Sequence, residues 1–371
     1  MDISFTTEHE QLRQTVRRFL ENESNEQTVR KLMETERGYD AKTWERMASE
    51  LSLLGLIVPE QHGGAGLGPV ELAIVMEEMG RVLFCGPYLS TAVLAAGALL
   101  HAADNAAQAR LLPAISTGKS IATLAFVEEH GRWDVESITM RAMRDESKWK
   151  LSGVKDYVLD GAIADSILVV ARTDSGLGLF QIDAGAQIDR NPLPTLDLTR
   201  KLARLTFSNT TTTLLSGSGD ATSALRHILS LGSAMLAAEQ VGGAQRCLEL
   251  STDYAKTRLQ FGRPIGSFQA IKHKCADMLV ETEFARSAAY NAAFAAADSD
   301  QAQLESAAQM ARSYCSEAFF HAAAENIQIH GGMGFTWEAS AHLYFKRARA
   351  GSMMFGDPID QRQKLSASLG L

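Results

Sequence analysis

Two short segments near the C-terminal end of the chain carry residues suited to binding a nucleoside diphosphate group. They are Arg258–Ile265, with the sequence RLQFGRPI, and Gln328–Gly334, with the sequence QIHGGMG. An arginine offers a planar fork of donors to a pyrophosphate, and an amide side chain can hydrogen-bond an adenine. Adjacent glycines let backbone N–H groups approach an anion closely. Each segment follows an alanine-rich stretch with a helical pattern, so both are expected at helix ends.

The elements that must position these segments follow one another in three blocks. Residues 6 to 118 have a helical pattern, in which Thr7 is expected to cap the first helix. Short β-rich segments then extend to residue 217, and long alanine-rich helices fill the remainder. The sequence therefore predicts an α+β fold that is mostly α. We expect an N-terminal helical domain (1–118), a middle antiparallel, barrel-like β-domain (119–217) and a C-terminal four-helix bundle (218–371).

Apolar spacing and turn residues locate the individual elements within these blocks. The glycine-rich loop Pro59–Gly68 leads into a helix that begins near Pro69, and it is interpreted as a structural turn because no GK[ST] follows. Ser152–Gly153 and Asn191–Pro192 are expected to be turns between strands. The expected helices are 89–100, 228–250, 270–297 and 304–329, and the expected strands are 121–127, 149–151, 157–159, 167–170, 177–182 and 205–207.

Composition narrows the class of protein. With 371 residues, 46% of them hydrophobic, the chain can bury a large core. A net charge of −8 argues against a nucleic-acid surface, which needs clustered positive charge. The apolar run 92–100 is too short to span a membrane, and the N-terminus does not resemble a secretion signal. We therefore expect a soluble cytoplasmic protein whose cysteines are buried thiols in a reducing compartment: Cys85, Cys247, Cys275 and Cys315.

Three motifs and the three-block order resemble the acyl-CoA dehydrogenase family over essentially the whole chain. The motifs are Asp253–Gly262 (DYAKTRLQFG), Ser267–Lys274 (SFQAIKHK) and Pro59–Gly66 (PEQHGGAG). Members of this family oxidise an acyl-CoA thioester to the 2-enoyl-CoA with FAD, in dimers or dimers of dimers. The resemblance implies the same cofactor and substrate class here.

The resemblance also implies roles for individual residues. In the family, one subunit clamps the ADP half of a flavin whose ring belongs to the neighbouring subunit. Carried over, Arg258 pairs with the pyrophosphate, and Phe261, Ile265 and Phe268 pack around the adenosine, with Gln269 beside them. Gln328 and the backbone of Gly331 and Gly332 bind the adenylate end.

The residues that complete a family active site are absent from their expected positions. The usual position of the catalytic glutamate is occupied by Phe355, and the alternative position on the first bundle helix by Gly232. Neither residue can accept a proton. The stretch that should bind the flavin ring is Phe126–Trp133 (FVEEHGRW), without the threonine or the Gly-Ser-Asp of the family. Tyr157–Leu159 likewise replaces Trp-Ile-Thr, so a hydroxyl near the ring is lost.

These absences lead to a hypothesis about assembly. The residues that are retained are those that, in the family, reach into the site of a neighbouring subunit. The residues that are missing are those that would build the chain's own site. The chain thus resembles the base-lacking subunits of heterotetrameric actinobacterial enzymes that shorten steroid side chains. A homologous dehydrogenase subunit in an α2β2 complex, an acyl-CoA substrate and electron-transferring flavoprotein as acceptor are the implied partners.

Other interpretations remain open. A homodimer could use Glu239 or Asp357 as an unconventional base, although Glu239 is also compatible with an interface carboxylate and Asp357 with a capping residue. The chain could instead be a flavin-free scaffold that stabilises a partner. DNA binding is disfavoured by the charge. His321 and Glu325 are spaced as a surface pair, without a further ligand at metal-binding spacing, so no metal is expected.

Overall fold

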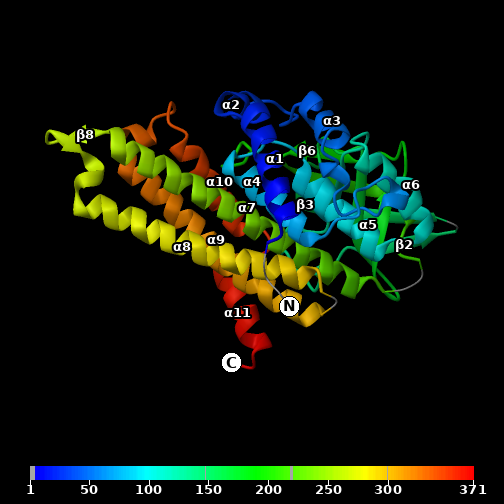
Figure 1. Cartoon of the computed structure of the whole chain (residues 1–371). Coiled ribbons are helices and arrows are strands. Elements are labelled where there is room, and N and C mark those ends of the chain that lie inside the picture. Colours follow the sequence, from blue (N-terminus) through cyan, green and yellow to red (C-terminus); the bar gives the residue numbers. More distant parts are fainter. Residues whose placement is uncertain (1–4, 147, 218–219, 299) are drawn as a thin grey trace. The chain divides into compact units, whose positions relative to one another are not determined.

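The computed structural model describes residues 5–146, 148–217, 220–298 and 300–371. Helices precede a β-sheet region and helices follow it, which confirms the predicted α+β architecture (Figure 1). Contacts divide the chain into two compact units, which are described separately. Unit 1 comprises Met1–Lys31, Pro69–Phe84 and Ser233–Leu371, and unit 2 comprises Leu32–Gly68 and Cys85–Gly232. Because each unit is built from separate stretches of sequence, the boundaries at 118/119 and 217/218 follow the order of elements and stay a prediction.

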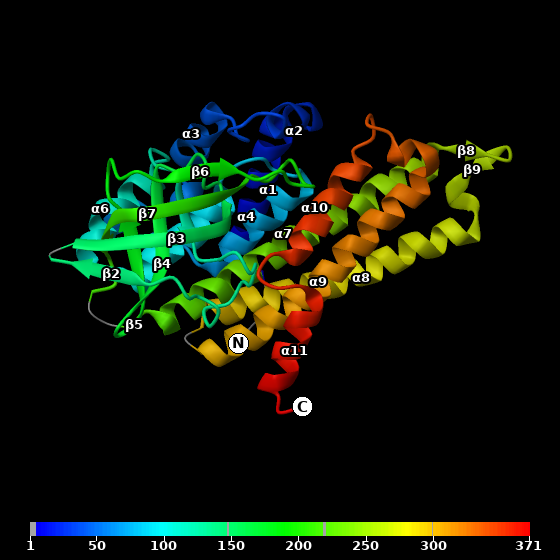
Figure 2. The ribbon, with the colours of Figure 1, turned by 180° about the vertical axis from the view of Figure 1, so that it is seen from behind.

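Unit 1 is a helical assembly built mainly on the C-terminal bundle. Helix α9 packs against α8, α10 and α11, and α4 packs against α1 and α8 (Figures 1 and 2). Helix α7 begins in unit 2, continues into unit 1 and is the first helix of the bundle. The bounds are α1 Thr7–Glu23, α2 Glu26–Met33, α4 Pro69–Arg81, α7 Thr222–Thr257, α8 Gln269–Ala296, α9 Gln301–His330, α10 Ala341–Met353 and α11 Pro358–Ser368.

Small residues allow these helices to pack closely, as the alanine-rich sequence predicts. Ala285, Ala289 and Ala293 on α8 are fully buried. On α7, a Cβ atom at Gly243 would lie 2.4 Å from the ring of Phe319 on α9. Glycine is therefore the residue that fits at this helix contact.

Helices α4 and α7 approach each other very closely at two glycines. A Cβ atom at Gly80 would lie 1.9 Å from the carbonyl oxygen of Glu239, and one at Gly242 would lie 1.8 Å from that of Glu77. Each glycine thus faces the backbone of the opposite helix. Any side chain at either position would force the two helices apart.

This contact buries carboxylates, and arginines neutralise them. Glu77 is 1% exposed, and it accepts a hydrogen bond from Arg13 at 2.7 Å, another from the Tyr290 hydroxyl at 2.5 Å, and a third from Arg286. Burial alone would raise the pKa of Glu77, but Arg286 and Arg13 hold the pKa below its usual value. The buried carboxylate is therefore ionised and fully paired.

Unit 2 contains the remaining helices and a seven-stranded sheet. The segment predicted as helix 89–100 consists of a π-helical stretch, Leu89–Ala95, followed by α5. The glycine-rich loop is a tight turn, in which a Cβ atom at Gly64 would lie 2.0 Å from the Val58 carbonyl oxygen, consistent with the structural interpretation. The other helices are α3 Ala41–Ser49, α5 Ala96–Ala102 and α6 Asn105–Ser116, with 3-10 turns at Leu53–Gly55 and Glu60–His62.

The sheet has the order β1-β4-β5-β7-β3-β2, with β6 also paired to β7 (Figure 2). Its ladders are antiparallel except for β1 with β4, which are parallel, so the purely antiparallel prediction was wrong for this pair. An isolated bridge between Arg141 and Arg172 joins the start of β2 to β4. The bounds are β1 Ala122–Ala125, β2 Ala142–Asp145, β3 Lys148–Leu159, β4 Ser166–Thr173, β5 Gly176–Ile182, β6 Asp189–Pro192 and β7 Leu202–Leu214.

Two predicted turns lie inside strands. Ser152–Gly153 forms an irregularity in the middle of β3, where the register with β7 shifts between Leu151 and Gly153. Glycine and serine mark a bulge as readily as a turn, which explains the error. Asn191–Pro192 ends β6, a strand whose one ladder among the described residues is with β7, so a proline is tolerated there.

Two local predictions also need correction. The cap of α1 is Thr6, whose hydroxyl accepts from the His9 backbone while the His9 ring accepts from the Thr6 backbone, so Thr7 is the first helical residue. Cys275 is partly exposed, whereas the other three cysteines are buried. The Cys275 thiol hydrogen-bonds Thr252 of α7, so the side chain is only partly covered by the neighbouring helix.

A buried ion pair lies at the centre of unit 2. The carboxylate of Glu128 accepts from the Lys155 ammonium at 2.9 Å, from the Thr139 backbone at 3.0 Å and from the Met140 backbone at 2.9 Å. Lys155 is completely buried, and its ammonium also donates to the Phe126 carbonyl at 3.2 Å. Burial would raise the pKa of Glu128, but Lys155 and Thr139 lower the pKa to about 2. Burial lowers the pKa of Lys155 to about 8.

Replacing Glu128 with glutamine should destabilise the protein strongly. The neutral amide would leave the Lys155 ammonium buried without an anion, at a cost of about 3–5 kcal/mol. Urea unfolding followed by tryptophan fluorescence measures this loss, because Trp44, Trp133 and Trp149 all belong to unit 2. Glu129→Gln is the matched control, because the Glu129 side chain is 65% exposed and its loss should cost about 1 kcal/mol or less.

The pH dependence of stability should identify Glu128 as the stabilising group. The pKa of Glu128 is lower in the folded protein than the ordinary 4.5, so its stabilisation is present above pH 4.5 and is lost as the pH falls toward about 2. The Glu128→Gln protein should show a shallower loss of stability across this range. Equal destabilisation by both substitutions, or identical acid profiles, would contradict a stabilising pair.

Candidate functional site

The first predicted segment forms a hairpin that connects α7 to α8. Strand β8 (Leu259–Gln260) pairs with β9 (Arg263–Pro264), and the two residues between them both have positive φ, 52° at Phe261 and 79° at Gly262. Two such residues form the tight connection that matches the twist of paired strands. The Ile265 N–H also donates to the Arg258 carbonyl at 2.8 Å. The hairpin extends beyond the ends of α7 and α8 (Figure 1).

The side chains of the hairpin point into solvent within this chain. Phe261, at the tip, is 90% exposed, and Phe268, before α8, meets it edge-on with ring centroids 5.9 Å apart. The Arg263 guanidinium lies over the Phe268 ring at 4.2 Å. Ile265 is partly exposed and Gln269 is exposed. An aromatic residue this exposed is available to cover a planar ligand or a partner surface.

Arg258 is the cation at the start of the hairpin. Its side chain is exposed, and none of the ion pairs formed among the described residues involves it. The neighbouring cation Lys256 pairs with Asp253 instead, at 3.6 Å. The guanidinium fork of Arg258 is therefore available for a bidentate anion.

The second predicted segment forms the C-terminal end of α9. Gln328 is exposed in the last turn, and Gly331 ends the helix with φ 62° and donates its N–H to the Gln328 carbonyl. Cβ atoms built at Gly331 and Gly332 would meet nothing within 4 Å. The backbone here is therefore open to a ligand. Gly334 differs, because its Cβ would lie 2.7 Å from the Ile327 carbonyl oxygen, and it has a packing role.

The two segments lie at the same end of the bundle. His330, the last residue of α9, stacks on Tyr254 of α7 with ring centroids 4.2 Å apart. Tyr254 is one helical turn before Arg258, and His330 directly precedes Gly331. Ser251 also donates to Asn326 at 3.0 Å, which fixes the two helix ends together. The folded chain thus brings together an unpaired guanidinium, exposed aromatic rings, an amide and two open glycines, a set that fits the ADP half of a dinucleotide.

The predicted position of the catalytic base lies in the connection between α10 and α11. Phe355 is 2% exposed and has φ 57°, in the left-handed region. The fully buried Arg312 donates to the Gly351 carbonyl at 3.0 Å and the Met354 carbonyl at 2.8 Å, and the Gln361 amide donates to the Phe355 carbonyl. The turn is rigidly held, but it presents a phenyl ring that can accept no proton. Arg312 gave no signal in the sequence, because a lone arginine within a helix usually faces solvent.

The other residues considered as bases are engaged elsewhere. Glu239 forms an ion pair with Arg347 at 2.9 Å, and the two side chains are only 6% and 4% exposed. Arg347 also donates to the Phe84 carbonyl at 3.3 Å. Asp357 caps α11 and accepts from the backbones of Ile359 and Asp360, at 2.8 and 2.9 Å. The structure therefore gives Glu239 and Asp357 structural partners.

The alternative position on α7 is equally unsuited to proton transfer. Gly232 and Ser233 both lie inside the helix and are buried, where unit 2 ends and unit 1 begins. In the family, the position of Ser233 commonly carries an arginine near CoA. A serine lacks the charge to bind a phosphate of CoA strongly.

The stretch predicted to face a flavin ring is organised around the Glu128–Lys155 pair. Phe126 packs edge-on against Trp133, with ring centroids 5.6 Å apart. Val158 and Leu159 are buried, whereas Tyr157 is 40% exposed with φ 52°. The Leu159 side chain offers no hydroxyl, as the sequence indicated. A sequence pattern could not reveal the buried pair, because a charged residue within a strand is usually on the solvent face.

Two further features were sought in the described part of the chain, a membrane-spanning helix and a metal site. Within it, no helix has the length and hydropathy to cross a bilayer. No group of three metal-ligating side chains occurs among those residues either. His321 lies 2.6 Å from Glu281 and 3.8 Å from Glu325, which itself binds Lys274, so the expected surface pair is part of a charged cluster.

Family models match both helical ends of the chain. The acyl-CoA dehydrogenase N-terminal domain matches residues 6–119, and the acyl-CoA dehydrogenase C-terminal domain matches residues 222–369. Acyl-CoA dehydrogenase IpdE2 of Mycobacterium tuberculosis is 37% identical over 362 residues, which cover 98% of this chain and 97% of that protein.

Solved structures share the fold of this chain. A variant of the Tcur3481-Tcur3483 steroid ACAD is 31% identical with a TM-score of 0.89, covering 98% of each chain. A chain of the ChsE4-ChsE5 complex from Mycobacterium tuberculosis is 27% identical with a TM-score of 0.91, covering 100% of this chain and 99% of that one. The fold and the order of its elements thus match over the full chain.

Proposed function

This chain belongs to the acyl-CoA dehydrogenase family, and we propose that it is the subunit without a catalytic base in a heteromeric acyl-CoA dehydrogenase. The enzyme would introduce the α,β double bond of an acyl-CoA thioester. Bound FAD supplies the acceptor for the β-hydride in this reaction. A homologous subunit would contribute the base that removes the α-proton.

One combination of features carries this proposal. The residues suited to the ADP half are exposed and available, whereas a buried phenylalanine occupies the position of the base. Arg258 would hold two pyrophosphate oxygens, and Gln328 with the open backbone of Gly331 and Gly332 would bind the adenylate end. Phe261 would cover the adenosine and exclude water from it. Each of these groups points away from its own chain, as a clamp on a neighbour's cofactor requires.

The relatives support the same arrangement. The names of two similar structures, the ChsE4-ChsE5 complex and the Tcur3481-Tcur3483 steroid ACAD, each join two gene products. By analogy we infer an α2β2 complex with a homologous dehydrogenase subunit, a steroid-derived acyl-CoA as the substrate class, and electron-transferring flavoprotein as the electron acceptor.

A competent homo-oligomer is the second candidate. It requires Glu239 or Asp357 to take up a proton, and both carboxylates already accept hydrogen bonds from Arg347 or from backbone N–H groups. A non-catalytic scaffold is the third candidate, in which the exposed clamp residues would contribute only to an interface.

Native mass and bound flavin should distinguish these candidates. The chain purified alone should carry little FAD, because its own ring-side contacts are missing. Co-expression with a homologous dehydrogenase partner should give a yellow heteromer with one FAD per pair, measured by native mass spectrometry and absorbance. A yellow homo-oligomer with one FAD per chain would refute the proposal, and a colourless heteromer would favour the scaffold.

Replacing Arg258 with alanine should weaken flavin binding in the heteromer. Loss of a charge-assisted pyrophosphate contact should cost about 1.5–3 kcal/mol, which is roughly a 10- to 150-fold increase in the Kd for FAD. Fluorescence titration of the apo-complex with FAD measures this Kd. Lys256→Ala removes a cation two residues earlier that pairs with Asp253, and it should leave the Kd unchanged. Full flavin affinity in Arg258→Ala would exclude Arg258 from the clamp.

Replacing Glu239 with glutamine should reduce stability without reducing turnover. The substitution leaves the buried Arg347 guanidinium without its anion, which should cost about 3–5 kcal/mol of unfolding free energy. The folded heteromer should keep its kcat, since the proposed base belongs to the partner. A loss of kcat by a factor of about 100 or more, at unchanged flavin content, would instead identify Glu239 as the base.

A further inference from the structure

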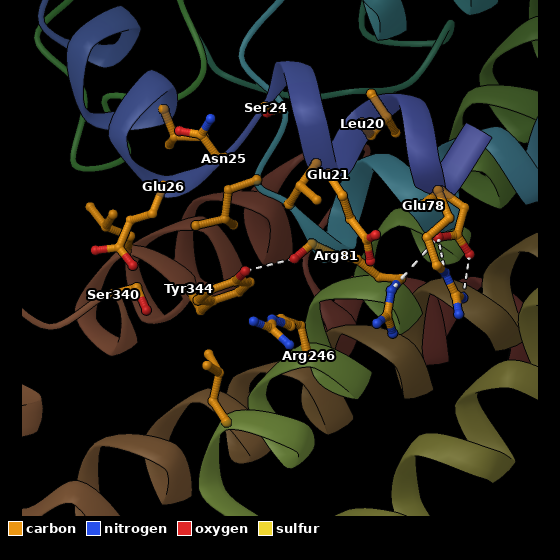
Figure 3. Close-up of a pocket in the computed structure, with 16 residues that line it drawn as sticks. Leu20, Glu21, Ser24, Asn25, Glu26, Glu78, Arg81, Arg246, Ser340 and Tyr344 are labelled. Carbon is orange, nitrogen blue, oxygen red and sulfur yellow. Dashed lines mark hydrogen bonds and ion pairs between the residues drawn. The ribbon is translucent and has the colours of Figure 1, made fainter. Parts of the chain in front are cut away.

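A cavity of about 340 Å³ lies within unit 1, away from the hairpin and the glycine segment. Helices α1, α4, α7 and α10 form its walls, with the start of α2 at its edge. In Figure 3 the Arg246 side chain rises from α7 into this space beside Tyr344, whose hydroxyl bonds the Arg81 carbonyl at 2.6 Å. This volume is within the lower range of ligand sites, about 300–1,000 Å³.

The three arginines that line the cavity differ in how fully they are paired. Arg17 gives Nε and Nη2 to Glu78, at 2.8 Å each. Arg81 gives both terminal nitrogens to Glu249, at 2.9 Å each. These two guanidinium forks are therefore occupied by carboxylates.

Arg246 is paired less completely. Its Nη1 donates to Glu249 at 3.2 Å, a carboxylate that is already shared with Arg81, and its guanidinium also hydrogen-bonds the Tyr344 hydroxyl. In the described part of the chain, Glu249 is the one carboxylate that forms an ion pair with Arg246. The Arg246 side chain is 40% exposed, so part of its fork faces the cavity. A guanidinium in this state can still bind a carboxylate through two hydrogen bonds.

The rest of the cavity is suited to an aliphatic group and unsuited to a polyanion. Its apolar wall consists of Leu20, Val29, Leu83, Leu250 and Leu343. Glu21 and Glu26 are exposed at its edge, and Glu26 is held by Arg30 at 2.8 Å. These acidic side chains would repel a phosphate ester more strongly than a single carboxylate.

We propose that this cavity binds a small monocarboxylate with an aliphatic body, whose carboxylate pairs with Arg246 and whose chain packs on the leucine wall. The site is independent of the flavin clamp, because no residue of the hairpin or of Gln328–Gly332 lines it.

Octanoate is the probe for this site. Titration calorimetry on the full chain, or on its heteromer, should show saturable binding of octanoate. Octan-1-ol has the same chain without the charge and should bind more weakly, and inorganic phosphate should neither bind nor compete. Arg246→Met should weaken octanoate binding at least about tenfold. Leu250→Trp should abolish binding by filling the cavity.

Two matched substitutions serve as controls. Arg226→Met removes an exposed arginine of unit 2 that pairs with Glu136, and it should leave octanoate binding unchanged. Arg258→Ala should also leave it unchanged, so failure of the flavin-clamp proposal and failure of this one are distinguishable. Octanoate binding to Arg246→Met within about twofold of the unaltered protein, persistent binding to Leu250→Trp, or competition by phosphate would each overturn the proposal. Circular dichroism verifies folding, and if Arg246→Met is unfolded, Leu250→Trp and the octanol comparison decide.

Discussion

The backbone contact between α4 and α7 is the constraint on which unit 1 depends. Gly80 and Gly242 bring the two helices so close that neither position can accept a Cβ atom. Helices in such contact cannot place long side chains between them, so the carboxylates of Glu77 and Glu239 are directed to the sides of the crossing. There they are nearly inaccessible to water, and ionised carboxylates persist in such places only with cationic partners.

This requirement explains why arginines contact the buried carboxylates of unit 1 and why those carboxylates are poor candidates for a general base. Arg13 and Arg286 neutralise Glu77, and Arg347 neutralises Glu239. Arg312 instead donates hydrogen bonds to the neutral carbonyl groups that end α10. A carboxylate that holds a guanidinium in a dry interior is stabilised as the anion and resists protonation, the opposite of what a general base must do during turnover.

The sequence was sufficient for features encoded locally and insufficient for those set by distant contacts. Alanine-rich periodicity located both ends of α8 within one residue and the ends of α9 within three. Ser152–Gly153 was mistaken for a turn because glycine permits both turns and bulges. The parallel pairing of β1 with β4 depends on segments about forty residues apart, which no local pattern specifies. Glu128 and Lys155 look like surface charges in the sequence, and only their pairing reveals the burial.

The exposed apolar residues of unit 1 have a different use in an isolated chain than in an assembly. Phe261, 90% exposed at the tip of a hairpin, contributes almost no buried apolar area to the stability of an isolated chain. Its burial by a nucleotide or a partner is favourable. Phe284 on α8, 62% exposed, adds apolar area on the same unit. The exposed groups of unit 1 are therefore ones that can bind a nucleotide or cover a partner surface. A buried phenylalanine, Phe355, occupies the position where the resemblance places the base, and this supports the proposal that the base comes from a homologous subunit.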